Sequence, residues 1–215
     1  MDIPLNKRLK RQLHRDMAGL QDVLVKIVYD LEPTAVMHGG TAIWRCFGGN
    51  RFSEDVDFYL SPKTSFQEEF AQALGREGAM LTKFRKTTNA IYAAVQRERT
   101  LVSFETALRP YKNPVASTYE KSDGTWLTIL TPSPEELLHE KLSAFQNRKL
   151  IRDIYDVYHL SAIATLSTSE KKELSEQLST LPTPVDEGNL KNLILQGAIP
   201  TFDQMVYALK IILGP

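Results

Sequence analysis

A short run of glycines and acids at residues 38–60 constrains this chain more than any other stretch. It reads HGGTAIWRCFGGNRFSEDVDFYL, and its last part is β-forming, with Asp55 and Asp57 two positions apart. Residues two apart on a strand point to the same face, about 6.5 to 7 Å apart along the backbone. Two carboxylates that close repel each other unless a cation lies between them. Because hard oxygen ligands suit Mg²⁺, we expect Asp55 and Asp57 to bind this ion.

The same run opens with a glycine pair and a threonine, Gly39, Gly40 and Thr41. Paired glycines let a backbone approach phosphate oxygens without a Cβ atom in the way. A helix that starts at Thr41 would add free N–H groups and the positive end of its dipole. Each signal alone is common in ordinary turns and strand ends. A phosphate-binding turn followed closely by a carboxylate pair predicts a nucleotide site.

The order of these signals resembles the AbiEii/AbiGii-type toxin family, which belongs to the DNA polymerase β-like nucleotidyltransferase superfamily. Residues 39–41 (GGT) are similar to the Gly-Gly-Ser/Thr turn of that family, and residues 51–57 (RFSEDVD) are similar to its R-F-S-x-D-[IV]-D segment. The resemblance implies that Ser53 lies in the nucleotide site. Arg45 and Arg51 flank this site and could meet phosphate oxygens, and Arg45 could equally cap its short helix. The resemblance also implies that Asp55 and Asp57 are the catalytic metal ligands.

A third acid, Glu105, lies within the last of three β-like runs at 80–84, 90–96 and 101–108. An acid in the middle of such a run is costly unless it has a partner. If its strand neighbours that of Asp57, Glu105 lies about 5 Å across the ladder. The three carboxylates would then suit two metal ions roughly 4 Å apart. The alternative is an exposed glutamate on an edge strand, but the superfamily has its third carboxylate on such a later strand.

The remaining patterns predict a mixed α/β fold. An apolar stripe at three- and four-residue spacing indicates one long helix from Leu5 to Leu31. A proline-containing loop is expected at 109–125. Further predicted elements are a helix at 65–77, a short strand at 126–130, and helices at 134–148, 151–164, 168–179, about 185–195 and 201–213. Together with the resemblance, these elements predict an α/β nucleotidyltransferase core, a small mixed sheet with flanking helices, at 1–130. A helical C-terminal domain is expected at 131–215.

The helix expected at 134–148 carries a lysine, Lys141, in the middle of its apolar arc, between Leu137 and Phe145. Such a lysine either extends its ammonium to solvent or meets an anion. Because an anionic nucleotide is already implied, the second interpretation is favoured. The toxin family also has a lysine in a segment like residues 140–142. By resemblance, Lys141 contacts the triphosphate.

Two further acids, Asp153 and Asp156, lie on the helix expected at 151–164. Residues 152–157 are similar to the R-D-[IL]-x-D-[IVL] motif of the family, which marks both positions as catalytic. Helical spacing places Asp153 on the packed side. Asp156 groups instead with Arg152 and His159, where it could form a plain surface ion pair. Asp153 is therefore expected to be the more buried of the two.

Composition narrows the class of protein. Lys+Arg and Asp+Glu both number 26, so the net charge is zero, which argues against a general nucleic-acid coat but allows a local basic groove. The single cysteine, Cys46, rules out an internal disulfide. No apolar run reaches the length of a signal core or a membrane span. We expect a cytoplasmic protein with no membrane association.

Together the residues and the resemblance predict an enzyme that moves a nucleoside monophosphate from an NTP to an acceptor, with Mg²⁺. The resemblance implies an RNA (tRNA-like) or protein acceptor, a role as the toxin of a toxin–antitoxin pair, and a cognate antitoxin as a partner. Two alternatives are a metal-dependent nuclease and a non-catalytic nucleotide-binding module. The glycine turn argues against the first, and the intact set of acids argues against the second.

Overall fold

The computed structural model describes residues 3–62 and 64–214. The chain forms two compact units, of which the first extends to Cys46 and resumes over Phe52–Pro132. The second combines the short segment Phe47–Arg51 with everything from Ser133 onward. The boundary predicted between residues 130 and 131 lies close to this division. The sequence did not indicate that Phe47–Arg51 belongs with the C-terminal helices.

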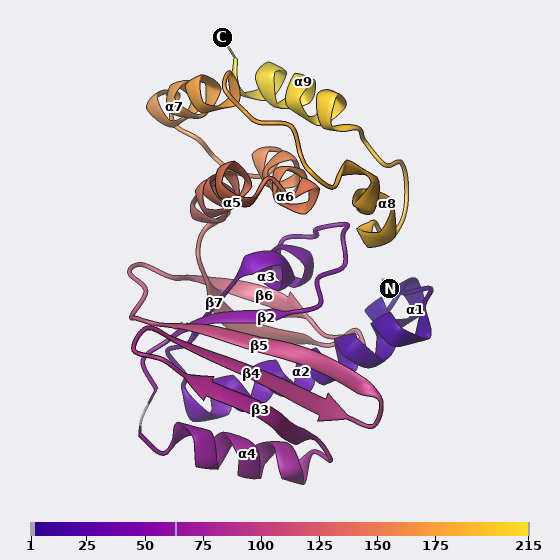
Figure 1. The fold of residues 1–215 in the computed structure, drawn as a ribbon, viewed down its shortest axis with the longest axis vertical. Coiled ribbons are helices and arrows are strands. Elements are labelled where there is room, and N and C mark those ends of the chain that lie inside the picture. The colour runs from indigo at the N-terminus through magenta and orange to yellow at the C-terminus, as the bar shows by residue number, and fades with distance from the viewer. Residues whose placement is uncertain (1–2, 63, 215) are drawn as a thin grey trace. The chain divides into compact units, whose positions relative to one another are not determined.

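A five-stranded mixed sheet forms the centre of the first unit (Figure 1). Its strands are β1 (Val36–His38), β2 (Val56–Leu60), β3 (Met80–Lys86), β4 (Ala90–Arg97) and β5 (Thr100–Leu108), in the spatial order β1-β2-β5-β4-β3. β2 and β5 run parallel, and the other neighbouring strands are antiparallel. The expected small mixed sheet with flanking helices is confirmed. Asp55 precedes β2, so the prediction that both acids lie on the strand was wrong for Asp55.

Two helices, α2 (Gln12–Leu31) and α4 (Phe66–Arg76), cover one face of this sheet (Figure 1). The alternation of side chains along a strand assigns the faces. On β5, the ring of Phe104 is fully buried and packs against Phe58, Phe66 and Phe70. The next residue, Glu105, is exposed on the opposite face. The apolar face therefore holds the core, and polar side chains gather on the other face.

The long N-terminal helix that the apolar stripe predicted is interrupted. Helix α1 ends at Arg8, Leu9 is extended and buried, and α2 starts at Gln12. The short helix α1 (Leu5–Arg8) is tied to a different part of the unit, because the Asn6 N–H donates to the Ser122 carbonyl at 2.9 Å. A continuous helix could not make that contact and still keep α2 on the sheet.

A separate two-stranded sheet, β6 (Val115–Glu120) and β7 (Trp126–Thr131), follows the main sheet. The prediction of a loop over 109–125 was therefore wrong for β6, whereas the short strand expected from Trp126 is confirmed. The run VASTYE has few apolar residues, but alternate side chains point inward. Tyr119 is completely buried, and its hydroxyl donates to Asp22 at 3.0 Å. Tertiary contacts of this kind, which sequence patterns do not show, stabilise the strand.

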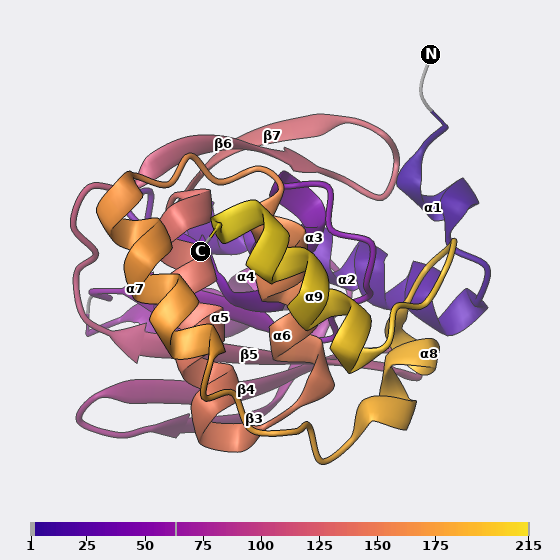
Figure 2. The ribbon, with the colours of Figure 1, turned by 90° about the horizontal axis from the view of Figure 1, so that it is seen from above.

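The second unit is helical. Its elements are α5 (Pro134–Arg148), α6 (Ile151–Ser161), α7 (Thr168–Leu178), the 3₁₀ turn η1 (Glu187–Asn189), α8 (Leu190–Leu193) and α9 (Phe202–Leu213). Ser133 and Glu136 form a capping box at the start of α5. Figures 1 and 2 show α5 and α6 as one layer and α7 and α9 as a second. In the described residues, no helix combines the length and apolar character needed to span a membrane.

The segment Phe47–Arg51 is bound to these helices by backbone contacts. The carbonyl of Asn50 accepts from the Leu195 N–H at 3.0 Å, and Arg51 forms a β-bridge with Ile194. His159 of α6 lies 2.8 Å from the Phe47 carbonyl. This attachment carries the side chain of Arg51 into the second unit, where it becomes part of a charged cluster.

Candidate active site

Gly39 and Asp57 are in direct contact in the first unit. Strand β1 ends at His38, and α3 (Gly39–Cys46) begins at once, two residues earlier than predicted. Gly39 has a φ of 73°, and a Cβ atom there would lie 2.3 Å from Oδ2 of Asp57. Only glycine tolerates both the left-handed backbone and this approach. The glycine turn and the acidic strand are thus built around each other.

Thr41 connects the start of α3 to the segment that leads into β2. Its side chain is fully buried, and its hydroxyl donates to the backbone carbonyl of Asp55. This contact holds Asp55 beside the N-terminal end of α3, although Asp55 itself is outside the strand. The first N–H groups of a helix lack intrahelical partners and form its positive end. An anion is therefore favoured at this end of α3, next to half-buried Asp55 and Asp57.

Strand register places the third acid beside the second. Asp57 on β2 is directly opposite Glu105 on the parallel strand β5, and His38 on β1 is its partner on the other side. Neighbouring strands lie about 4.8 Å apart, so this register brings Glu105 next to Asp57. The pairing of these strands, which the sequence left conditional, is now established. Glu105 is exposed as the alternative proposed, but β5 is an interior strand of the sheet.

The acids fit a divalent metal by their chemistry, since Asp55, Asp57 and Glu105 offer hard oxygen donors. Asp57 and Glu105 are paired by register, and Asp55 is held nearby through its carbonyl. Within residues 3–62 and 64–214, no group of three His, Cys, Asp or Glu side chains is already arranged to bind a metal ion. The assignment of Mg²⁺ to these carboxylates stays a prediction.

The second unit contains a compact charged cluster around Lys141, in which all the groups except Arg148 are buried. The Lys141 ammonium lies 2.9 Å from Asp156 and 3.7 Å from Asp153. Arg51 donates through Nε and Nη2 to both oxygens of Asp156, each at 2.6 Å. Arg148 binds Asp153 in the same bidentate way, at 2.7 Å for both contacts. Three cations and two carboxylates leave these five groups with one excess positive charge.

Burial and ion pairing oppose each other at Asp156. The residue is 1% exposed, and burial by itself would raise its pKa. Arg51 and Lys141 outweigh burial, so the pKa of Asp156 lies below its ordinary value. In turn, the carboxylate outweighs the effect of burial on Arg51 and raises the pKa of that guanidinium. Asp156 is therefore ionised at neutral pH.

The structure corrects two predictions about charged residues. Asp156 is not a surface acid paired with Arg152 and His159: it is as deeply buried as Asp153, because Arg51 reaches it from 105 residues earlier. Arg45 was expected to meet phosphate oxygens or to cap its helix. It is 2% exposed and forms an ion pair with Asp22.

Three other predicted residues have structural contacts. Arg51 is bound to Asp156, as described. Ser53 is buried, and its carbonyl accepts from the Gln21 side chain at 2.8 Å. Lys141 is 7% exposed and lies on the buried arc, as its helical position predicted. The nucleotide contacts predicted for Arg51, Ser53 and Lys141 stay predictions.

Arg148 was missed by the sequence interpretation. It lies in the last turn of α5, and left-handed Lys149 (φ 57°) then turns the chain toward Asp153. The signal in the sequence was a basic residue at the end of one helix. It is followed by a short chain reversal and by a helix that carries an acid. Lys83 and Arg85, two cations of β3, were also not predicted as candidate site residues. Their spacing of two in a β-like run was the signal for a shared face.

A match to a family model defines the class of protein as a nucleotidyltransferase. The family model described as "Nucleotidyl transferase AbiEii toxin, Type IV TA system" matches residues 22–181. The chain therefore belongs to the AbiEii family, which confirms the resemblance. A comparison with curated protein sequences found no match.

Solved structures show the same fold. JHP933 from Helicobacter pylori is 20% identical with a TM-score of 0.68, over 94% of this chain and 91% of that one. MenT4, a nucleotidyltransferase toxin from Mycobacterium tuberculosis, is 18% identical with a TM-score of 0.63, over 94% of this chain and 84% of that one. At such low identity, these likenesses establish the architecture only.

Proposed function

We propose that this nucleotidyltransferase uses Mg²⁺ to move a nucleoside monophosphate from an NTP to a hydroxyl group of an RNA or protein acceptor. The observation that carries the proposal is the placement of Asp57. Asp57 lies opposite Glu105 in the pairing of β2 with β5. Its side chain also approaches Gly39, which has no Cβ atom, at the start of α3. An anion-binding helix end and a carboxylate pair are thereby brought to one place.

In this proposal the residues of the first unit divide the work between nucleotide and acceptor. The N–H groups at Gly39, Gly40 and Thr41 bind the β- and γ-phosphates. Asp55 and Asp57 hold Mg²⁺, with Glu105 as a further ligand. Once bound, the ion would neutralise charge on the phosphate under attack. We also assign Glu105 as the base that accepts the proton of the attacking hydroxyl.

The transfer exchanges one bond to phosphorus for another. The acceptor oxygen forms a bond to the α-phosphorus, and the bond from that phosphorus to the bridging oxygen of the β-phosphate breaks. Pyrophosphate leaves with the electron pair, and the hydroxyl proton passes to the base. Charge therefore accumulates on the leaving phosphates, and preorganised cations stabilise it. We assign this task to Lys141, whose cluster carries an excess positive charge.

Asp153 and Asp156 are assigned a positioning role, because they hold Lys141 and are themselves held by arginines. A lysine between two buried carboxylates loses most of its rotamer freedom. It is therefore ready to meet a phosphate without further ordering. Arg51 and Ser53 are kept as candidate nucleotide contacts, and Arg51 also fixes Asp156.

The biological role proposed is that of a toxin with a cognate antitoxin, acting in the cytoplasm where NTPs are available. Expression of the wild-type chain in a bacterial host should then slow growth, whereas expression of the Asp57→Asn variant should allow normal growth. Normal growth with the wild-type chain would favour a non-toxic member of the family. That result would leave the transferase chemistry untouched.

The direct test incubates the purified chain with each α-³²P-labelled NTP, Mg²⁺ and total RNA, and follows the label by electrophoresis. Label should enter RNA or protein with one preferred NTP, and γ-labelled NTP should give none. Asp57→Asn should abolish transfer while the thermal unfolding midpoint is retained. An Asp57→Asn variant with normal transfer would exclude the proposed site.

A further inference from the structure

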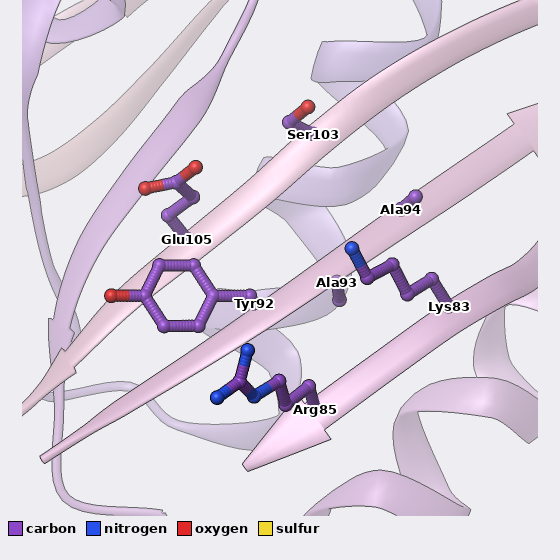
Figure 3. Close-up of a pocket in the computed structure, with 7 residues that line it drawn as sticks. All are labelled: Lys83, Arg85, Tyr92, Ala93, Ala94, Ser103 and Glu105. Carbon is purple, nitrogen blue, oxygen red and sulfur yellow. The ribbon is translucent and has the colours of Figure 1, made fainter. Parts of the chain in front are cut away.

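A shallow hollow lies on the polar face of the sheet, over β3, β4 and β5 (Figure 3). Its volume is about 280 Å³. The residues that line it are Lys83, Arg85, Tyr92, Ala93, Ala94, Ser103 and Glu105. It belongs entirely to the first unit, and it shares Glu105 with the carboxylate site.

Strand register orders the lining residues. One row across the sheet pairs Arg85 with Tyr92, Tyr92 with Glu105, and Glu105 with Asp57. A second row pairs Lys83 with Ala94 and Ala94 with Ser103. Because the side chain of Ala94 is small, it leaves open space above β4, and this space forms part of the hollow. The first row therefore leads from a cation, past an aromatic ring, to the acids of the proposed active site.

The two cations, Lys83 and Arg85, give the outer end of the hollow its charge. Both are exposed, and Figure 3 shows both extending from β3 toward the neighbouring strand β4. A register shift between Leu81 and Lys83 brings both onto this face. Charged residues on an edge strand also discourage pairing with other chains. That role alone does not require an aromatic ring and a hollow beside them.

Tyr92 supplies the second element of recognition. It is 42% exposed although it lies in the middle of an interior strand. Many proteins bind single-stranded nucleic acid with an exposed ring on a sheet and cations nearby: bases stack on the ring, and phosphates meet the cations. Three strand spacings separate Arg85 from Asp57, about 14 Å in all. The end of a nucleic-acid strand can span this distance.

We propose that the hollow is the acceptor subsite and binds the end of a single-stranded RNA. Lys83 and Arg85 contact a backbone phosphate, and an adjoining base stacks on Tyr92. The terminal ribose hydroxyl then lies toward Glu105 and Asp57, where transfer takes place. The inference rests on the proposed function, and it selects RNA from the two acceptor classes. The two cations at its outer end favour a polyanion over a cationic small molecule.

The test compares the wild-type chain with three surface variants. Lys83→Gln/Arg85→Gln removes the phosphate contacts, Tyr92→Leu removes the stacking ring, and Tyr92→Phe retains it. Lys86→Gln is the matched control, because Lys86 is exposed on the same strand but pairs with buried Ile91 and so points to the other face. All are expected to unfold at the wild-type temperature, since the substituted side chains are exposed.

The first readout is binding of a fluorescent single-stranded RNA, measured by anisotropy without Mg²⁺ or NTP. The double variant should bind at least tenfold more weakly, and its dependence of log K on log salt should be shallower by about 0.7, because one phosphate is no longer neutralised. Tyr92→Leu should bind about tenfold more weakly, whereas Tyr92→Phe and Lys86→Gln should match wild type. Equal binding by the double variant and Lys86→Gln would overturn the proposal.

The second readout is transfer of the labelled nucleotide. The double variant should raise KM for RNA by about tenfold, with a smaller effect on KM for NTP. Label that enters protein and not RNA in the wild-type reaction would overturn the subsite while leaving the transferase intact. A wild-type chain that transfers nothing would contradict the proposed function. In that case the RNA-binding measurement, which needs no catalysis, still tests whether the hollow binds RNA.

Discussion

A Cβ atom at position 39 would lie 2.3 Å from Oδ2 of Asp57. The glycine of the phosphate-binding turn is therefore also the residue that makes room for the acid on β2. This dependence explains why the two signals occur close together in the sequence. It also allows an alanine scan to separate backbone strain from displacement of the acid.

Gly39→Ala should lower transfer by at least about 10²-fold, because Asp57 must move away from its position, and small misplacements of reacting groups are costly. The matched control is Gly48→Ala, whose φ of 65° imposes similar strain but whose Cβ atom would meet nothing within 4 Å. Both variants should lose about 1 to 2 kcal/mol of unfolding free energy from the left-handed backbone. Equal activity of the two variants would contradict the role of Gly39.

Triphosphate binding should depend on Mg²⁺, because the ion offsets the repulsion between phosphates and the acids at 55 and 57. The preferred NTP at 100 times its Kd should stabilise the fold by about 2.7 kcal/mol with the metal. The stabilisation should be small without Mg²⁺, and smaller with AMP, which lacks the β- and γ-phosphates. Differential scanning fluorimetry gives all three values. A thermal shift unaffected by removal of the metal would exclude the carboxylate site.

Lys141→Met should separate catalysis from stability. After the change, Asp156 keeps Arg51 and Asp153 keeps Arg148, so the unfolding free energy should change by no more than about 1 to 2 kcal/mol. Transfer should fall about 10²-fold or more, as when one preorganised electrostatic contact is lost. Chemical unfolding and single-turnover transfer measure the two effects.

Arg51→Met is the comparison for Lys141→Met. It removes both arginine hydrogen bonds from a carboxylate that is 1% exposed, and disrupting a buried pair in this way costs about 3 to 5 kcal/mol. Arg51→Met should thus be the less stable of the two variants, by a clear margin in urea unfolding. A Lys141→Met enzyme with wild-type rates would remove the lysine from the mechanism.

Asp156 should make the second unit acid-sensitive. Its pKa is lower in the folded chain than in the unfolded chain, where it is about 3.9. Its contribution to stability is therefore fully present above the unfolded value, and it is lost as pH falls through the folded one. Urea unfolding from pH 7 down to about pH 3 should show this decline. Asp156→Asn should be less stable at pH 7 and should decline less, and parallel curves would contradict the assignment.

Local sequence was sufficient for most elements of the fold. The capping box Ser133–Glu136 and the proline at the first helical position determine where α5 begins. Alternation along 101–108 determined which side of β5 is apolar, and with it the face of Glu105. These features depend on backbone hydrogen bonding and burial of nearby residues. The roles proposed for the acids came from the family motif.

Long-range contacts decided the rest. Asp156 is buried because Arg51, 105 residues away, neutralises it, and no helical periodicity reports such a partner. Strand β6 forms because Tyr119 is buried and bonded to Asp22, which a polar run does not reveal. The row from Arg85 to Asp57 exists only through the register of four strands. Local propensity sets which residues form an element, whereas charge neutralisation and register between distant segments require the folded chain.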